Sequence, residues 1–131
     1  MKFNQVSFII GALFLFSQCA QNESVNSFNF LVEPYLQYGT KSGMVVLWET
    51  NLPSTTTVYY GESVYDSGEP ILSQSVSIEG LKTMHEVVLS DLKTETDYFY
   101  QIQSISEDGD TLKSKINPFK TAVYDSTAYM F

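Results

Sequence analysis

A chain of 131 residues that is 44% apolar and 15% aromatic can bury one good hydrophobic core but hardly two, so we expect one domain. Seven lysines, no arginine and fifteen acidic residues give a formal charge of −8, which repels phosphate backbones and argues against a nucleic-acid partner. The lack of arginine also removes the planar donor best suited to hold a phosphate.

The first part of the chain has the pattern of an export signal. Lys2 precedes an apolar run over residues 6–16, which is too short to cross a bilayer as a stable helix. We therefore expect residues 1–18 to be a signal peptide that is removed. Residues 19–27 are polar and without periodicity, and we expect them to form a tether between the membrane and the domain.

The end of the apolar run resembles a bacterial lipobox. Phe16, Ser17 and Gln18 precede Cys19, the only cysteine, although the family prefers leucine at the position of Phe16 and glycine or alanine at that of Gln18. A lone cysteine in an exported chain has no disulfide partner. We expect an acylated Cys19 to hold the protein on a lipid bilayer of the bacterial cell envelope, as a periplasmic or cell-surface lipoprotein; an ordinary secretory signal and an uncleaved anchor are the alternatives.

From residue 28 onward, short apolar runs alternate with turn residues at the spacing of an all-β sandwich. Pro34 is tolerable only near the start or edge of a strand, and Pro53 and Gly80 predict breaks. The Asp-Gly pair within residues 107–110 predicts a hairpin turn. We expect strands over residues 32–38, 44–50, 56–61, 75–79, 83–89, 97–105 and 113–121.

The spacing of Leu92 and Tyr98 predicts a tyrosine corner, in which a tyrosine hydroxyl bonds to backbone a few residues upstream. We expect this hydroxyl to donate to a buried acceptor; an ordinary hairpin with a surface tyrosine is the alternative. Trp48 is the largest single piece of the predicted core. These features, without a cysteine pair between sheets, predict a seven-stranded immunoglobulin/fibronectin type III-like sandwich.

Four segments resemble, in order and spacing, the N-terminal domain of purple acid phosphatases and related metallophosphoesterases: residues 32–37 (VEPYLQ), 43–50 (GMVVLWET), 58–61 (VYYG) and 85–92 (HEVVLSDL). The closing Phe119-Lys120-Thr121 fits as well, so the domain is expected over residues 28–122. The resemblance implies a two-metal centre, iron with zinc, manganese or iron, only in a C-terminal catalytic domain that is missing here. It implies that residues 123–131 begin the linker or first strand of that domain.

The remaining candidates for chemistry favour structural roles. His85 shares a strand face with Val87 and Leu89, and one imidazole makes no metal or proton-transfer site. Three carboxylates in the turn over residues 107–110 lack the ligand count of a calcium loop. We therefore expect no catalytic residue, no metal site and no cofactor in this chain.

One feature suggests a partner surface. Several apolar residues have the outward parity of their strands, where a free sandwich usually places polar side chains. We interpret them as a docking face for the missing catalytic domain; ordinary surface apolar content, or cover by loops, is the alternative. They are Val45, Leu47, Tyr59, Val88 and Phe99.

Two functions follow from the sequence. The first is a non-catalytic N-terminal accessory domain of an exported metal-dependent phosphatase or phosphoesterase, which positions the C-terminal metallophosphatase domain. The second is a free-standing surface lipoprotein whose fibronectin-like module binds glycan or protein.

Overall fold

The computed structural model describes residues 27–123, which form strands, turns and connecting loops. There is no helix in this range, and so none that could span a membrane. The strands, in chain order, are β1 (Phe30–Gln37), β2 (Met44–Glu62), β3 (Tyr65–Asp66), β4 (Glu69–Pro70), β5 (Gln74–Leu89), β6 (Asp97–Ile105), β7 (Thr111–Lys113) and β8 (Asn117–Lys120).

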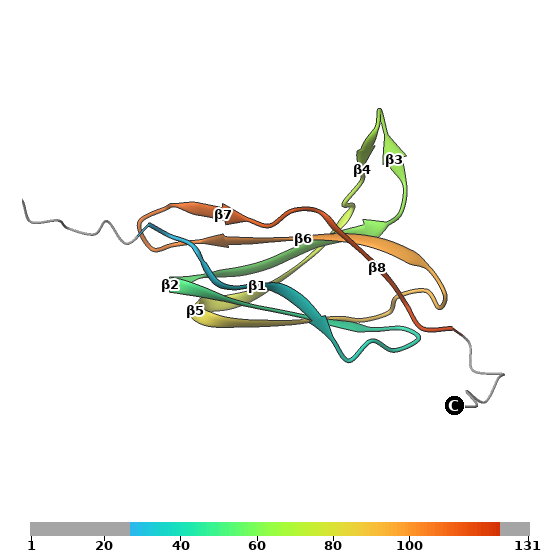
Figure 1. Ribbon diagram of the computed structural model, residues 1–131, viewed down its shortest axis with the longest axis horizontal. Coiled ribbons are helices and arrows are strands. Elements are labelled where there is room, and N and C mark those ends of the chain that lie inside the picture. Colours follow the sequence, from blue (N-terminus) through green and yellow to red (C-terminus); the bar gives the residue numbers. More distant parts are fainter. Residues whose placement is uncertain (1–26, 124–131) are drawn as a thin grey trace, which may run out of the picture.

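The strands are arranged in two layers, and the long strands β2 and β5 bend at one end of the molecule to contribute to both (Figure 1). The lower sheet contains β1, residues 44–49 of β2 and residues 84–89 of β5, all antiparallel. The upper sheet pairs residues 56–60 of β2 with residues 74–78 of β5, and residues 57–62 of β2 with β6; β7 and β8 pair with β6. The predicted all-β, fibronectin type III-like sandwich is confirmed.

The bends explain why fewer long strands are present than the sequence predicts. Residues 44–50 and 56–61, predicted as two strands, are the two halves of β2, and the β2–β5 register shifts on both sides of Ser54. Pro53 therefore marks a corner where the strand changes sheets. Gly80, with φ of 93°, lies at the matching corner of β5, because a left-handed conformation favours glycine.

Other boundaries also differ from the prediction. The segment predicted as one strand over residues 113–121 is split into β7 and β8, because Ser114 turns inward between them and exchanges hydrogen bonds with Ile102. The predicted loop after Gly61 contains the hairpin β3–β4, which projects from the upper sheet (Figure 1). Gly61 lies against the backbone carbonyl of Ile71 at the base of this hairpin, where a side chain would not fit.

The core lies between the two sheets and is built from alternate positions of the strands. The predicted inward residues of β2 and β6 are buried, which confirms the period of two. Each fully buried residue such as Leu89 or Ile102 stabilises the fold by about 1.5 to 3 kcal/mol. The core residues are Met44, Val46, Trp48, Val58, Tyr60, Val87, Leu89, Leu92, Tyr98, Tyr100, Ile102 and Phe119.

Candidate functional site

A buried cluster of polar side chains surrounds His85, near the end of the core where β2 and β5 bend. The imidazole is 2% exposed and stacks on Trp48 with ring centroids 4.8 Å apart. Its Nδ1 lies 2.6 Å from the hydroxyl of Thr56, and its Nε2 lies 3.0 Å from that of Thr50 and 3.3 Å from that of Ser54. Both ring nitrogens therefore have partners inside the protein.

The electrostatics of this cluster keep His85 neutral. Burial and, to a lesser extent, the positive charge of Lys82 lower the pKa of His85 from 6.5 to about 4. Its hydrogen-bonding partners are hydroxyl groups, and no carboxylate orients the ring as a catalytic base requires. The structure thus places His85 in the core, well inside the long strand β5 and not near the start of a separate strand over residues 83–89 as the sequence predicted, and supports the predicted structural role.

Metal ligands are not gathered anywhere in residues 27–123: no group of three or more His, Cys, Asp or Glu side chains could hold a metal ion. The three predicted turn carboxylates, Glu107, Asp108 and Asp110, are exposed on the hairpin between β6 and β7. This turn is closed by hydrogen bonds between Ser106 and both Gly109 and Asp110, and Gly109 has the expected positive φ.

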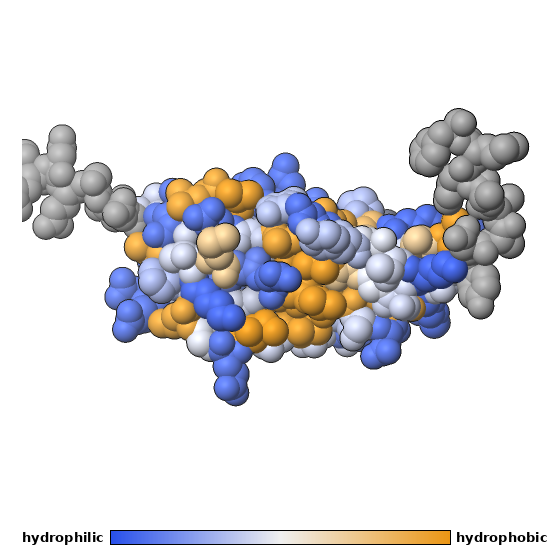
Figure 2. Space-filling view, turned by 90° about the horizontal axis from the view of Figure 1, so that it is seen from below, coloured by the Kyte–Doolittle hydropathy of each residue, from blue (hydrophilic) through white to orange (hydrophobic). Residues whose placement is uncertain are grey.

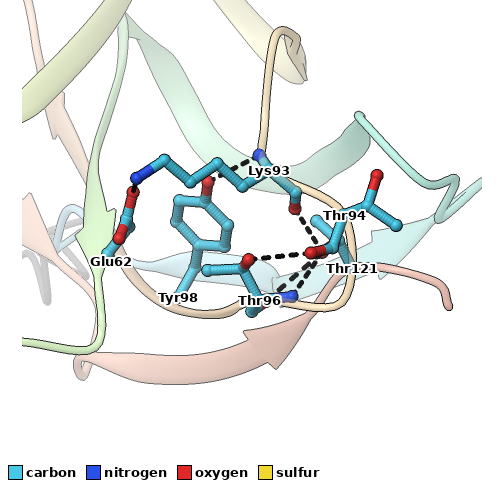
Figure 3. A network of polar contacts seen from close by, with 6 residues as sticks. All are labelled: Glu62, Lys93, Thr94, Thr96, Tyr98 and Thr121. Atoms are coloured by element: carbon cyan, nitrogen blue, oxygen red, sulfur yellow. Dashed lines mark hydrogen bonds and ion pairs between the residues drawn. The ribbon is translucent and has the colours of Figure 1, made fainter. Parts of the chain in front are cut away.

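The tyrosine corner is confirmed, with one change in its hydrogen bond. The backbone N–H of Lys93 donates to the Tyr98 hydroxyl at 2.8 Å, so this oxygen accepts, whereas the sequence predicted that it donates to a buried acceptor (Figure 3). Tyr98 is buried and stacks on Phe119, and Leu92 is buried beside them in the core. Burial, followed by the charges of Tyr98 and Asp91, raises the pKa of the nearby Tyr60.

Thr121 ties the C-terminal end of the domain to this corner. Its hydroxyl donates to the carbonyl of Lys93 at 2.6 Å and accepts from the backbone N–H of Thr96 at 2.9 Å (Figure 3). The next residue, Ala122, donates to the carbonyl of Thr40 and accepts from the N–H of Glu95. The chain therefore leaves the sandwich from a fixed position, which the sequence analysis did not identify.

The five residues predicted as a docking face do not share one surface. Val45, Leu47 and Val88 lie on the outer face of the lower sheet, whereas Tyr59 and Phe99 lie on the outer face of the upper sheet. The prediction that they form a single docking face is wrong, because the bend of β2 places its two halves in different layers. Val45 is only 9% exposed, and Tyr65 of the β3–β4 hairpin packs edge-on against Phe99, as the alternative of loop cover anticipated.

The outer face of the lower sheet carries apolar side chains that the sequence analysis missed. Val32 and Tyr35 of β1 and Met84 of β5 lie there beside Leu47 and are all exposed. Hydrophobic residues gather over the middle of this face (Figure 2). Met84 could have been found, because residues 84, 86 and 88 alternate with the buried residues 85, 87 and 89.

Comparison with known proteins agrees with this architecture. The family model for the purple acid phosphatase N-terminal domain matches residues 32–121, which is more than half of the chain. The chain belongs to this family. The family's domain is non-catalytic, in keeping with the absence of a metal-binding group in the described part of this purple acid phosphatase N-terminal domain. No curated protein matches the sequence closely enough to count as a relative.

Solved structures show the same fold at low identity. A chain described as a myokine structure is 22% identical, with a TM-score of 0.54, over 70% of this chain and 94% of that one. A human fibronectin type III domain solved in solution is 14% identical, with a TM-score of 0.53, over 76% of this chain and 82% of that one. The FN5 domain of Drosophila Lar is 19% identical, with a TM-score of 0.50, over 70% and 92% of the two chains.

Cys19 and the predicted signal and tether segments lie outside the described residues, except for residue 27, as does the predicted linker after residue 123. The acylation of Cys19 and the segment boundaries therefore stay predictions.

Proposed function

We propose that this chain is the non-catalytic N-terminal accessory domain of an exported metal-dependent phosphatase or phosphoesterase, and that it positions a metallophosphatase domain C-terminal to it. The observation that carries this proposal is the family match over residues 32–121. The iron centre with zinc, manganese or a second iron belongs to that further domain. A two-metal site needs several ligands close together, and residues 27–123 do not supply them.

The position of the two ends suits a spacer. Residues 27 and 123 lie at opposite ends of the sandwich, whose long axis is horizontal in Figure 1. At about 3.3 Å per residue, a strand of the length of β6 extends roughly 30 Å. A domain of this shape would separate the point where the catalytic domain begins from a tether attached to the membrane. Because Thr121 and Ala122 are hydrogen-bonded to the body of the domain, the exit direction would be fixed.

We propose that the tether is anchored by an acylated Cys19, which places the protein in the bacterial cell envelope as a lipoprotein. Metabolic labelling with a clickable fatty acid should give a signal that Cys19→Ser removes, and the variant should leave the membrane fraction. A label that persists in Cys19→Ser would contradict this anchor.

The sequence that follows codon 131 in the genome tests the main proposal. An in-frame domain with the Asp, Asn and His ligands of a metallophosphatase supports it. An authentic stop codon would instead favour the free-standing lipoprotein, whose case rests on the apolar outer face of the lower sheet.

A biochemical measurement complements the test by the downstream genomic sequence. The purified chain should hydrolyse p-nitrophenyl phosphate only at background rate with iron, zinc or manganese supplied, from acid to alkaline pH. Turnover that survives repurification and disappears in His85→Ala would overturn the accessory role.

A further inference from the structure

The outer face of the lower sheet is unusually apolar for a solvent-facing surface. Met84 is 74% exposed and Val88 is 57% exposed, and Val32 and Tyr35 are each about two-fifths exposed. Val32, Tyr35, Leu47 and Met84 line a groove of about 140 Å³, and Val88 lies outside it on the same face. Figure 2 shows that hydrophobic residues gather over the middle of this face, with hydrophilic residues beside and between them. A contiguous exposed apolar area on a sheet marks a site of contact with another surface.

Two carboxylates lie within this apolar area. Glu49 is opposite Met84 in the β2–β5 pairing, and Glu86 is opposite Leu47, and both line the groove. Strand geometry puts the two residues about 8 Å apart. Within residues 27–123, no ion pair or side-chain hydrogen bond to Glu49 or Glu86 is seen. A surface that covers the groove must therefore supply positive charge, because an unpaired carboxylate is costly to remove from water.

Charge excludes three possible occupants. A second copy of the chain in a symmetric contact would bring Glu49 and Glu86 against each other. Residues 124–131 of the chain itself contain Asp125 and no lysine or arginine. An anionic membrane surface would be repelled by a chain with a formal charge of −8.

The chain leaves the domain next to this face. Ala122 donates a hydrogen bond to Thr40, whose own N–H donates to Gly43 immediately before β2 begins. Val45 and its partner Val88 are the next outward pair along the sheet, within about 15 Å of the exit by strand geometry. A domain that follows residue 123 could fold back on the lower sheet without a long linker.

We propose that the outer face of the lower sheet is the docking surface for the domain that follows in the same polypeptide, through an apolar segment that carries lysine or arginine opposite Glu49 and Glu86. The identity of this partner rests on the proposed function. The expected chemistry of the partner surface, apolar and positively charged, is inferred from the residues of the outer face of the lower sheet alone.

The test probes the chemistry first, with random peptides displayed on phage and selected on the immobilised 131-residue chain. Enriched peptides should combine apolar residues with lysine or arginine. Their binding should move the backbone NMR signals of Leu47, Met84 and Val88. The double variant Glu49→Gln/Glu86→Gln should bind them about tenfold more weakly, the loss expected for two partly exposed ion pairs.

Two further variants make the result specific. Met84→Glu should abolish binding, because it adds a third carboxylate to the apolar area. Gln103→Glu is the matched control: it adds the same charge to the outer face of the upper sheet, where Gln103 pairs with Thr57, and should leave binding unchanged. Circular dichroism and the urea midpoint of each variant establish that it is folded.

Each other outcome overturns the proposal. Enriched peptides without lysine or arginine, or no enrichment at all, would contradict the assigned chemistry. NMR signal shifts confined to residues of the upper sheet would contradict the assigned position. Concentration-dependent dimerisation that Met84→Glu abolishes would make a second copy the occupant.

The identity of the partner has its own test. If the downstream sequence encodes a metallophosphatase domain, overlapping peptides from that domain should include one that competes with the selected phage peptides; if none competes, docking in the same polypeptide is wrong. If no such domain is encoded, the proposed function and the partner's identity fail together, while the phage result still decides the chemistry of the face.

Discussion

Two buried polar clusters lie toward opposite ends of the same core, one around His85 and one around Tyr98, and they use different chemistry. In the first, three hydroxyl groups contact the ring of a histidine. In the second, the hydroxyls of Tyr98 and Thr121 bond to backbone groups of Lys93 and Thr96. Within residues 27–123, no buried side-chain nitrogen or oxygen lacks a partner, so both clusters are complete.

The difference between them lies in titration. A histidine can take up a proton near neutral pH, whereas a tyrosine hydroxyl that accepts from an amide and a threonine hydroxyl stay uncharged in acid. Acid should therefore weaken the end of the core where β2 and β5 bend and leave the corner where the chain exits intact. An accessory domain whose titratable cluster lies away from the chain exit would keep the position of that exit over a wide pH range.

The largest expected effect comes from acidification. The native pKa of His85, about 4, is below its unfolded value of 6.5, so the unfolded state binds more protons between these pH values. The contribution of His85 is complete above about pH 6.5 and is lost as the pH falls toward 4, by about 3 kcal/mol in total. Urea unfolding midpoints at a series of pH values measure this loss.

The control for acidification is His85→Phe, which keeps an aromatic ring beside Trp48 but cannot titrate. Its stability at neutral pH should be lower, and its additional loss between about pH 6.5 and 4 should be smaller than in the unaltered chain. Equal losses in the two proteins would show that carboxylates, and not His85, carry the acid sensitivity.

The next largest effect is expected at Thr121, in the second cluster. Thr121→Val keeps the shape but removes an acceptor for the Thr96 N–H and a donor to the Lys93 carbonyl. Two partly buried backbone groups would lose a partner, at a cost of about 2 to 3 kcal/mol. This loss should be the same at neutral and acid pH, which thermal or urea unfolding can establish; Thr121→Ser, which keeps the hydroxyl, should retain most of the stability.

Tyr98→Phe should have a smaller effect, since it removes the acceptor of one hydrogen bond and leaves the ring stacked on Phe119. The Lys93 N–H would be left without its partner, at a cost of roughly 1 to 2 kcal/mol. The matched control is Tyr35→Phe on the exposed face of β1, which should not move the urea midpoint. A midpoint unchanged in Tyr98→Phe would mean that the corner hydrogen bond does not contribute to stability.

Much of the fold was predictable because its signals are local. The alternation at residues 44, 46 and 48 predicts the buried face of β2, and the spacing of Leu92 and Tyr98 predicts the corner. The strand boundaries were less predictable, because Pro53 and Gly80 mark bends within continuous strands as readily as breaks between them. Because the sequence does not reveal these bends, it could not show which outward-facing residues lie on the same sheet.

The polar clusters were harder to predict because their members are far apart in the chain. Thr50 is 35 residues from His85, and Thr121 is 28 residues from Lys93. No local pattern links such pairs. The position of Tyr35 was also hidden, since register shifts on either side of Val32 in β1 alter which side chains point outward.

The smallest effect is expected from the side chain of Lys93, although its backbone belongs to the corner. Its ammonium group lies 2.6 Å from Glu62, but the two side chains are 69% and 41% exposed, and surface ion pairs of this kind contribute little to stability. The hydrogen bond to Glu62 and then the charge of Glu62 raise the pKa of Lys93, so its ammonium group stays charged at neutral pH and loses its proton in strong alkali. Lys93→Gln should therefore leave the urea midpoint in physiological salt unchanged within error, while Tyr98→Phe lowers it. If Lys93→Gln lowered the midpoint as much as Tyr98→Phe, the stability of the corner would come from this ion pair and not from the backbone N–H that donates to Tyr98.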